Sequence, residues 1–226
     1  MDRAVAAARR AFEQGRWTRQ PPAARKRVLL RFAELLLANR DELALLETLD
    51  MGKPISDSLG VDIPATARCI AWYAEAIDKI YDEIAPTGAD ALAMITREPV
   101  GVVAAIVPWN FPLIMAAWKI GPALAAGNSL ILKPSEKSPL SAIRIASLAA
   151  EAGIPDGVFN VLPGFGHTAG QALALHMDVD CVGFTGSTRT GKLMLQYTAQ
   201  SCRGISRCSW PRGSSVLLLP PAIRWC

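Results

Sequence analysis

The sequence predicts an α/β protein: a helical N-terminal segment followed by a Rossmann-like parallel sheet with helices on both faces. Three observations predict it. Apolar residues recur at helical spacing through the first 85 residues. From Gly101 onward, short apolar runs alternate four times with helical segments, and short joints connect them. Finally, 226 residues that are 51% hydrophobic suffice for a large buried core.

The N-terminal segment contains start and stop signals for helices. Asp2 is a candidate cap for the first helix, which is expected to stop at Gly15. Gly52-Lys53-Pro54 is a stop signal for the third helix, and Pro64 is expected to bend the fourth. An extended stretch is expected over 92–97. The expected helices are 2–15, 22–38, 41–51 and one that continues through Ile80.

The second part of the chain alternates strands and helices. The expected strands are 101–107, 129–133, 158–162 and 181–185. The expected helices are 113–126, 139–151, 168–175 and 187–198. Because ligands bind at the carboxyl ends of parallel strands, the four strand-to-helix joints are the expected functional positions.

Charge and cysteine content limit the compartment and the partners. Residues 1–200 carry 20 basic and 20 acidic side chains, so the net charge of +4 resides in the last 26 residues and indicates no nucleic-acid partner. The uncharged run 99–118 has the length of a membrane span, but the sequence Pro-Trp-Asn-Phe-Pro at its centre favours a soluble protein without a membrane contact. Cys69 and Cys181 in apolar surroundings indicate a reducing, cytoplasmic location, and no metal spacing is present.

The four joints read PWNFP (108–112), KPSEKSP (133–139), PGFGH (163–167) and FTGST (184–188). None is the dinucleotide fingerprint GxGxxG. Gly186 and Ser187 at a helix start nevertheless favour a pyrophosphate. Gly166 lets the backbone approach a flat ring, and Lys133 with Glu136 suits phosphate oxygens and a ribose diol. The alternative interpretation is that the glycines and the serine are ordinary turn and cap residues and that Lys133 and Glu136 are solvated.

Taken together, the motifs resemble a known family. GVVAAIVPWNFPLIMAAWKIGPALAAGNSLILKPSEKSPLSA, PDGVFNVLPGFG and VGFTGSTRTGK resemble the NAD(P)-dependent aldehyde dehydrogenase superfamily in order and spacing from about Asp2 to Ser201. Within it, LALLETLDMGKPI, AWYAEAIDKI and KPSEKSPLSAIRIA are most similar to the γ-glutamyl-γ-aminobutyraldehyde dehydrogenases of putrescine breakdown. The resemblance implies a partial aldehyde dehydrogenase fold, a small-molecule aldehyde and its NAD-dependent oxidation to a carboxylic acid.

The resemblance also implies roles for individual residues. Asn110 matches the amide donor to the oxyanion that forms when a cysteine thiolate attacks the aldehyde. The implied cofactor-binding residues are Val107, Trp109, Lys133, Glu136, Gly166, Gly186 and Ser187. A carboxylate at the ribose, Glu136, favours NAD over NADP. The implied aldehyde-tunnel residues form one helical stripe, which could equally be core: Phe111, Ile114, Met115 and Trp118. Lys119 matches a family position whose role stays open.

The family pattern stops after Ser201. The family spacing puts the general base near Ser209, and a hydroxyl without its own base cannot do that work. The nucleophilic cysteine falls beyond residue 226, so Cys202, Cys208 and Cys226 do not take its role. We therefore expect a truncated chain in three parts: a helical segment 1–98, an NAD-binding domain 99–201, and a disordered or out-of-frame tail 202–226.

Two hypotheses about what this chain does follow from this pattern. The first is an inactive fragment of an aldehyde dehydrogenase. The alternative is a non-catalytic NAD-binding or partner-binding module. The family is homo-oligomeric, and the β-hairpin arm used in its assembly is expected to be missing from this chain.

Overall fold

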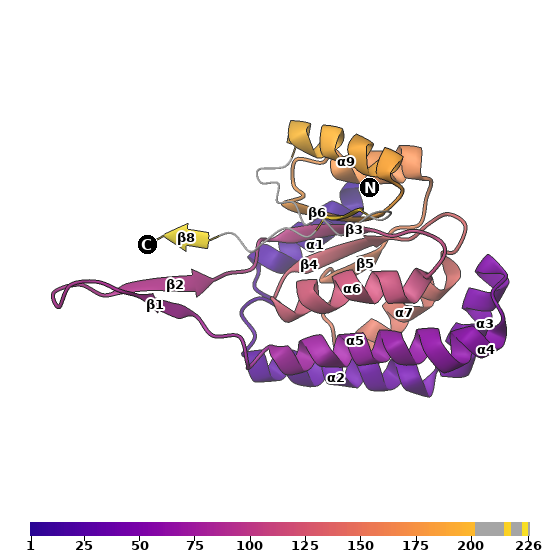
Figure 1. Cartoon of the computed structure of the whole chain (residues 1–226), viewed down its shortest axis with the longest axis horizontal. Helices are drawn as coiled ribbons and strands as arrows, with labels where there is room; N and C mark the ends of the chain where they lie inside the picture. Colours follow the sequence, from indigo (N-terminus) through magenta and orange to yellow (C-terminus); the bar gives the residue numbers. More distant parts are fainter. Residues whose placement is uncertain (202–214, 218–222, 226) are drawn as a thin grey trace.

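The computed structural model describes residues 1–201, 215–217 and 223–225, and it has the predicted α/β architecture (Figure 1). Its central sheet has the order β5-β4-β3-β6-β7. The first four of these strands are mutually parallel, and β7 pairs with β6 antiparallel. The strands are β3 (Val102–Ile106), β4 (Ser129–Lys133), β5 (Phe159–Val161), β6 (Cys181–Gly186) and β7 (Ser215–Leu217).

Every residue of β3 and β4 is buried, because helices cover both faces of the sheet. Val102, Ala104 and Ile106 point to one face and join a hydrophobic cluster with α1, α8 and α9. Val103 and Ala105 alternate with them and point to the other face, into the larger cluster. The helices on the first face are α1 (Asp2–Glu13), α8 (Gln171–Ala174) and α9 (Thr188–Ser201).

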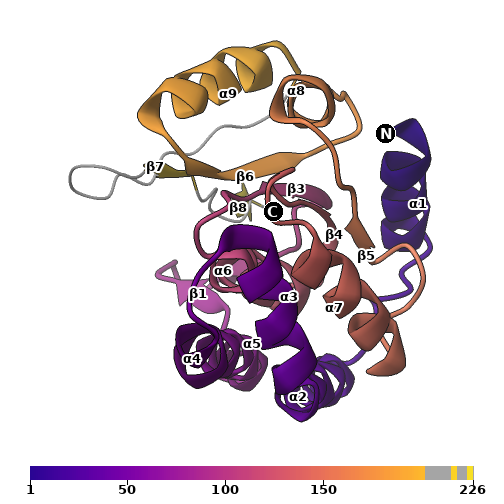
Figure 2. The same cartoon turned by 90° about the vertical axis from the view of Figure 1, so that its right-hand side faces the viewer.

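The second face of the sheet carries two helical layers (Figure 2). Next to the sheet lie α6 and α7, and beyond them lie α2, α3 and α5 (Figures 1 and 2). One hydrophobic cluster connects these layers to the sheet, so residues 1–98 and 99–201 share a core. These helices are α2 (Pro22–Ala38), α3 (Arg40–Met51), α5 (Ile63–Ala76), α6 (Pro112–Ala125) and α7 (Leu140–Glu151).

Three helices differ from the sequence prediction. Asp2 is the first residue of α1 rather than its cap, so its carboxylate acts on the helix dipole and not on an amide. The predicted fourth helix divides into α4 (Ile55–Asp57), a π-helical turn η1 (Ser58–Asp62) and α5, and α5 ends at Ala76, before Ile80. Pro64 lies in the first turn of α5, directly after the π turn. The predicted helix 168–175 begins as a second π turn, η2 (Gly166–Gly170), followed by α8.

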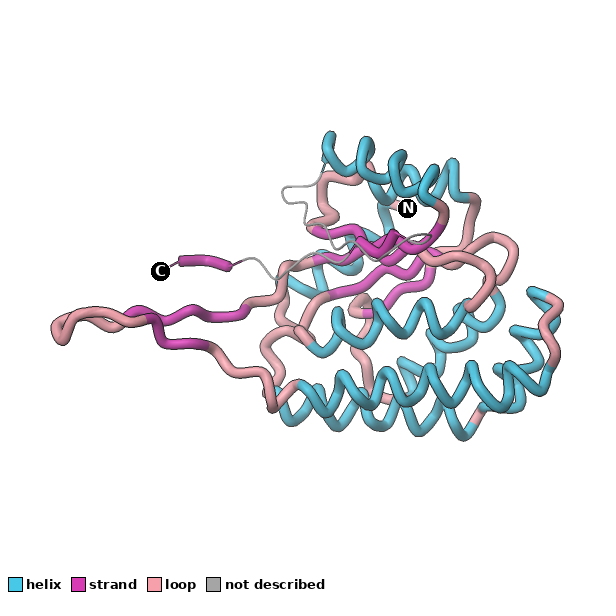
Figure 3. Tube along the Cα trace, viewed as in Figure 1, coloured by secondary structure: helices cyan, strands magenta, loops and turns pink. Residues whose placement is uncertain are grey.

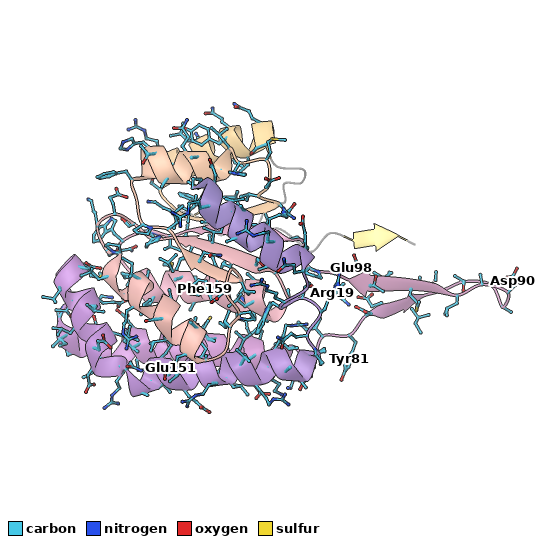
Figure 4. The ribbon with its side chains drawn as sticks, turned by 180° about the vertical axis from the view of Figure 1, so that it is seen from behind. Arg19, Tyr81, Asp90, Glu98, Glu151 and Phe159 are labelled. Atoms are coloured by element: carbon cyan, nitrogen blue, oxygen red, sulfur yellow. The ribbon has the colours of Figure 1, made fainter. Side chains whose placement is uncertain are left out.

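A β-hairpin projects from the body of the molecule, with β1 (Glu83–Ala85) and β2 (Ala93–Arg97) joined by a loop (Figure 3). Asp90 lies at its tip, while Tyr81 and Glu98 lie at its base (Figure 4). The third strand of this small sheet is β8 (Ile223–Trp225), antiparallel to β2. The chain thus contains a projecting hairpin, and the expectation that it lacks the arm used in oligomerisation stays a prediction. The sequence predicted only an extended stretch here, since these short strands lack a buried apolar run.

Among the described helices, none combines the length and the hydropathy that crossing a lipid bilayer requires.

Candidate functional site

The four joints begin at the same edge of the sheet, because β3, β4, β5 and β6 are parallel. From β3 the chain proceeds outward through β4 to β5 and then returns to place β6 on the other side of β3. The strand order therefore reverses between β3 and β6, and such a reversal opens a crevice at the carboxyl edge. Asn110 follows β3 and Ser187 follows β6, so the first and last joints flank this position.

The first joint, residues 107–111, is fixed to the second joint by hydrogen bonds. The Val107 N–H donates to the carbonyl of Lys133 over 3.2 Å. The buried Ser138 hydroxyl donates to the carbonyl of Trp109, also over 3.2 Å. Asn110 lies exposed between these anchors and α6, and its side-chain amide makes no hydrogen bond to any other residue within 1–201. An amide in this state can donate to an external oxygen.

The beginning of α6 is stabilised from a distant helix. Pro112 occupies its first turn and has no N–H, so the amide of Leu113 is the first one that needs a partner. That amide donates to Glu47 Oε1 on α3 over 2.9 Å. Glu47 is completely buried, and desolvation is the main cause that raises its pKa to about 7.

The helical stripe after Asn110 is partly open to solvent. Phe111 and Trp118 are exposed, whereas Ile114 and Met115 are half-buried. Among these four residues, Met115 packs against the larger hydrophobic cluster. The stripe is therefore not a fully buried core, and its role in an aldehyde tunnel stays a prediction.

The second joint contains an ion pair at the end of β4. Lys133 is buried, and its Nζ lies 3.3 Å from Glu136 Oε2, which is more exposed. A backbone hydrogen bond at Glu136, with a further one from Lys133, lowers the pKa of the Glu136 carboxyl. The joint therefore presents an ionised carboxylate next to a desolvated ammonium.

The third and fourth joints differ in how much space surrounds their glycines. A Cβ added at Gly166 meets no atom within 4 Å, so the surface above it is open. A Cβ at Gly186 lies only 2.5 Å from Phe184 Cζ, so a larger residue there would have to displace the Phe184 ring. Ser187 Oγ accepts a hydrogen bond of 3.2 Å from the Thr190 N–H and thereby caps the start of α9.

Lys119, whose role the resemblance left open, also lies in this region. It is 3% exposed, and its Nζ donates to Thr185 Oγ1 on β6 over 2.5 Å. Desolvation lowers the pKa of Lys119 to about 8. A lysine within an otherwise apolar helix was the signal in the sequence. Glu47 gave a comparable signal, because it follows the buried Leu43 and Ala44 at helical spacing.

Several expected features have no structural description. The position expected for the general base, Ser209, and the cysteines Cys202, Cys208 and Cys226 lie outside the described residues. Within the described residues, no three His, Cys, Asp or Glu side chains form a group that could hold a metal ion.

Comparison with known proteins identifies the family. Residues 1–209 match the aldehyde dehydrogenase family, which extends the predicted resemblance past Ser201. The NADP/NAD-dependent aldehyde dehydrogenase PuuC of Escherichia coli (strain K12) is 66% identical over 201 residues, which cover 89% of this chain and 41% of PuuC. The chain thus spans about two-fifths of the length of this curated relative.

Two solved structures are similar in fold and sequence. An indole-3-acetaldehyde dehydrogenase complexed with NAD+ superposes with a TM-score of 0.88 and is 68% identical. A γ-glutamyl-γ-aminobutyraldehyde dehydrogenase from Burkholderia cenocepacia J2315 has a TM-score of 0.88 and is 65% identical. Each comparison covers 89% of this chain and 41% of the other. The chain belongs to the aldehyde dehydrogenase family.

Proposed function

We propose that this chain is the NAD-binding part of an enzyme that oxidises an aldehyde to a carboxylic acid. The observation that carries the proposal is the common edge at which the four joints begin, around the reversal between β3 and β6. That edge combines an amide donor at Asn110, the ion pair of Lys133 and Glu136, and the capped helix start at Ser187. NAD bound at this edge would supply a hydride acceptor for the oxidation of the aldehyde.

The residues at this edge are chemically suited to a dinucleotide. Amides at the start of α9 favour a pyrophosphate, with Gly186 and Ser187 next to it. The open surface at Gly166 leaves room for the adenine. Lys133 and the ionised Glu136 suit the adenosine ribose, while Val107 and Trp109 border the cofactor on the side of β3. Repulsion between Glu136 and a 2′-phosphate favours NAD over NADP.

Asn110 is proposed as the oxyanion donor for the same reaction. Its amide is exposed and unpaired within residues 1–201, as required for a donor to a negatively charged oxygen. The accessible stripe of Phe111, Ile114, Met115 and Trp118 is proposed as part of the path of the aldehyde. Similarity to the Burkholderia enzyme supports γ-glutamyl-γ-aminobutyraldehyde as the substrate.

For the 226-residue chain itself, we propose NAD binding without turnover. The position that the family spacing assigns to the general base holds Ser209. The division into 1–98, 99–201 and 202–226 and a cytoplasmic location remain part of this proposal.

We also propose that the projecting hairpin contacts a second copy of the chain, because it exposes Ile84, Leu92 and Met94.

Titration calorimetry with the purified chain tests the proposal. We expect NAD to bind, NADP to bind more weakly, and Lys133→Ala to weaken NAD binding at least about tenfold, as for loss of a charged hydrogen bond. Lys79→Ala is the matched control, since Lys79 is also ion-paired but lies in the turn that follows α5. Equal NAD affinity in wild type and Lys133→Ala contradicts the site. Production of NADH from γ-glutamyl-γ-aminobutyraldehyde contradicts the absence of turnover.

A further inference from the structure

The turn from Asn110 to Leu113 is held by two side chains that come from a different part of the chain. We propose that Glu47 and Lys53 are positioning residues for Asn110, which fix this turn at both of its ends. The proposal rests on the oxyanion role proposed for Asn110 and explains how that amide keeps its position on an exposed loop.

Glu47 holds the far end of the turn. It lies on α3, 66 positions before Leu113, and its Oε1 accepts the Leu113 N–H over 2.9 Å. No residue nearer in the sequence provides a side-chain cap for α6. Because unsatisfied amides at a helix start are costly when buried, this carboxylate determines where α6 begins.

Lys53 holds the near end, next to Asn110. Its Nζ lies 4.3 Å from the centroid of the Phe111 ring, which is within the range of cation–π attraction. Gly52, in the left-handed region at φ 76°, ends α3 immediately before Lys53 and reverses the chain there. A side chain from beyond the end of α3 thereby reaches the loop that follows β3.

The two positioning residues belong to one buried charge cluster. Lys53 Nζ is paired with the carboxylate of Asp62, which is 2% exposed. The charge of Asp62 also acts on Glu47 and raises the pKa of its carboxyl, while that of Lys53 lowers it. Burying three ionisable groups is unfavourable unless each has a partner. Here Lys53 pairs with Asp62 and contacts the Phe111 ring, and Glu47 Oε1 accepts the Leu113 N–H, so two of the three groups contact the turn. The buried Glu47 Oε2 has no hydrogen-bond partner among the described residues.

A second cation makes the arrangement nearly symmetrical about Asn110. Lys137 Nζ lies 5.7 Å from the ring centroid of Trp109, as Lys53 lies over Phe111. Both aromatic neighbours of Asn110 are therefore exposed to solvent, and each has a lysine Nζ close to its ring. Restraint of the neighbours limits the positions that the amide between them can adopt.

The test measures the turn directly, in the 226-residue chain. Tryptophan is replaced by 5-fluorotryptophan, and the ¹⁹F signal of Trp109 is assigned with Trp109→Phe. We expect Glu47→Ala to shift or broaden this signal and to speed hydrogen exchange at Leu113 at least tenfold. Glu47→Gln is expected to restore protection at Leu113, since its amide oxygen accepts the same N–H. Lys53→Met is expected to move the Trp109 signal while Leu113 stays protected.

Glu42→Ala is the matched control, because Glu42 is also a carboxylate of α3 that binds a distant side chain, Arg144, but it lies on the surface. We expect Glu42→Ala to leave the ¹⁹F signal of Trp109 and the hydrogen exchange at Leu113 unchanged.

An unchanged Trp109 signal and unchanged exchange at Leu113 in Glu47→Ala overturn the proposal for Glu47. If Glu47→Ala does not fold, Glu47→Gln tests the role of Glu47. Loss of protection at Leu113 in Glu47→Gln overturns that role. An unchanged Trp109 signal in Lys53→Met overturns the role of Lys53. Neither readout involves NAD or an aldehyde, so a failure here is distinct from a failure of the proposed function.

Discussion

The first and the last joint of the sheet are stabilised in opposite ways. The joint after β3, which carries Asn110, depends on side chains from far along the chain: Glu47, Lys53 and Ser138. The joint after β6 is capped locally, by Ser187 and the amide of Thr190 three residues later. A local cap fixes a helix start, whereas contacts from several elements also fix the joint relative to the rest of the protein. The difference suits a reacting group at the first joint and a backbone phosphate site at the last.

The largest expected effect concerns Lys119, which connects the two joints by linking α6 to β6. Its pKa is about 8 in the folded protein and 10.5 when unperturbed, so the unfolded state binds more protons between these values. The free energy of unfolding should therefore rise by up to about 3 kcal/mol as the pH increases from 8 to 10.5. Lys119→Met should lack this rise. Urea unfolding of both proteins at several pH values checks it, and parallel pH curves contradict it.

The next effect concerns Glu47 at the first joint. Here the free energy of unfolding changes with pH in the opposite direction to that expected for Lys119. Its pKa is raised from 4.5 to about 7, mainly by desolvation, so the folded state binds more protons in this range. Wild type should lose stability as the pH rises from 4.5 to 7, on the order of 2 kcal/mol relative to Glu47→Gln. The same substitution at the exposed Glu42 should produce no such difference, and thermal unfolding from pH 4.5 to 8 compares the three proteins.

Two glycines of the last joints provide a matched pair. Gly186→Ala should lower the free energy of unfolding by about 1–2 kcal/mol, because the new Cβ meets the Phe184 ring. Gly166→Ala should change it by less than about 0.5 kcal/mol, since the space there is open. If adenine occupies that space, Gly166→Ala weakens NAD binding without loss of stability. Chemical denaturation and calorimetry separate the two effects, and equal stability losses refute the distinction.

The smallest effect is expected for the local cap. Ser187→Ala should cost about 1 kcal/mol of stability, the usual contribution of a serine cap. Ser187→Asp retains an acceptor for the Thr190 amide and should restore stability, but its charge should weaken pyrophosphate binding. If Ser187→Ala also disturbs the Trp109 signal of the first joint, the two joints are not independent.

Local patterns predicted those elements that local interactions determine. The predicted limits of the helix at 22–38 and of the strand at 129–133 coincide with α2 and β4, because Pro22 starts the one and the apolar run 130–132 forms the centre of the other. The cap at Ser187 was equally visible. The contacts of Glu47 with Leu113 and of Lys53 with Phe111 connect distant segments, so no local pattern reveals them. The hairpin at β1 and β2 escaped prediction because its alternation is weak and its side chains are largely exposed.

The π turn η1 has a consequence for tolerance to insertions and deletions. Its i→i+5 bonds contain one residue more than an α-helical turn does. Each residue of an α-helix rotates the chain by about 100°. Deletion of a single residue from 58–61 would therefore convert the turn to regular α-helix and leave the angular offset between α4 and α5 nearly unchanged. A one-codon deletion in η1 would thus preserve the meeting of Asp62 and Lys53, whereas a one-codon deletion within α5 would rotate the residues on its two sides by about 100° relative to each other.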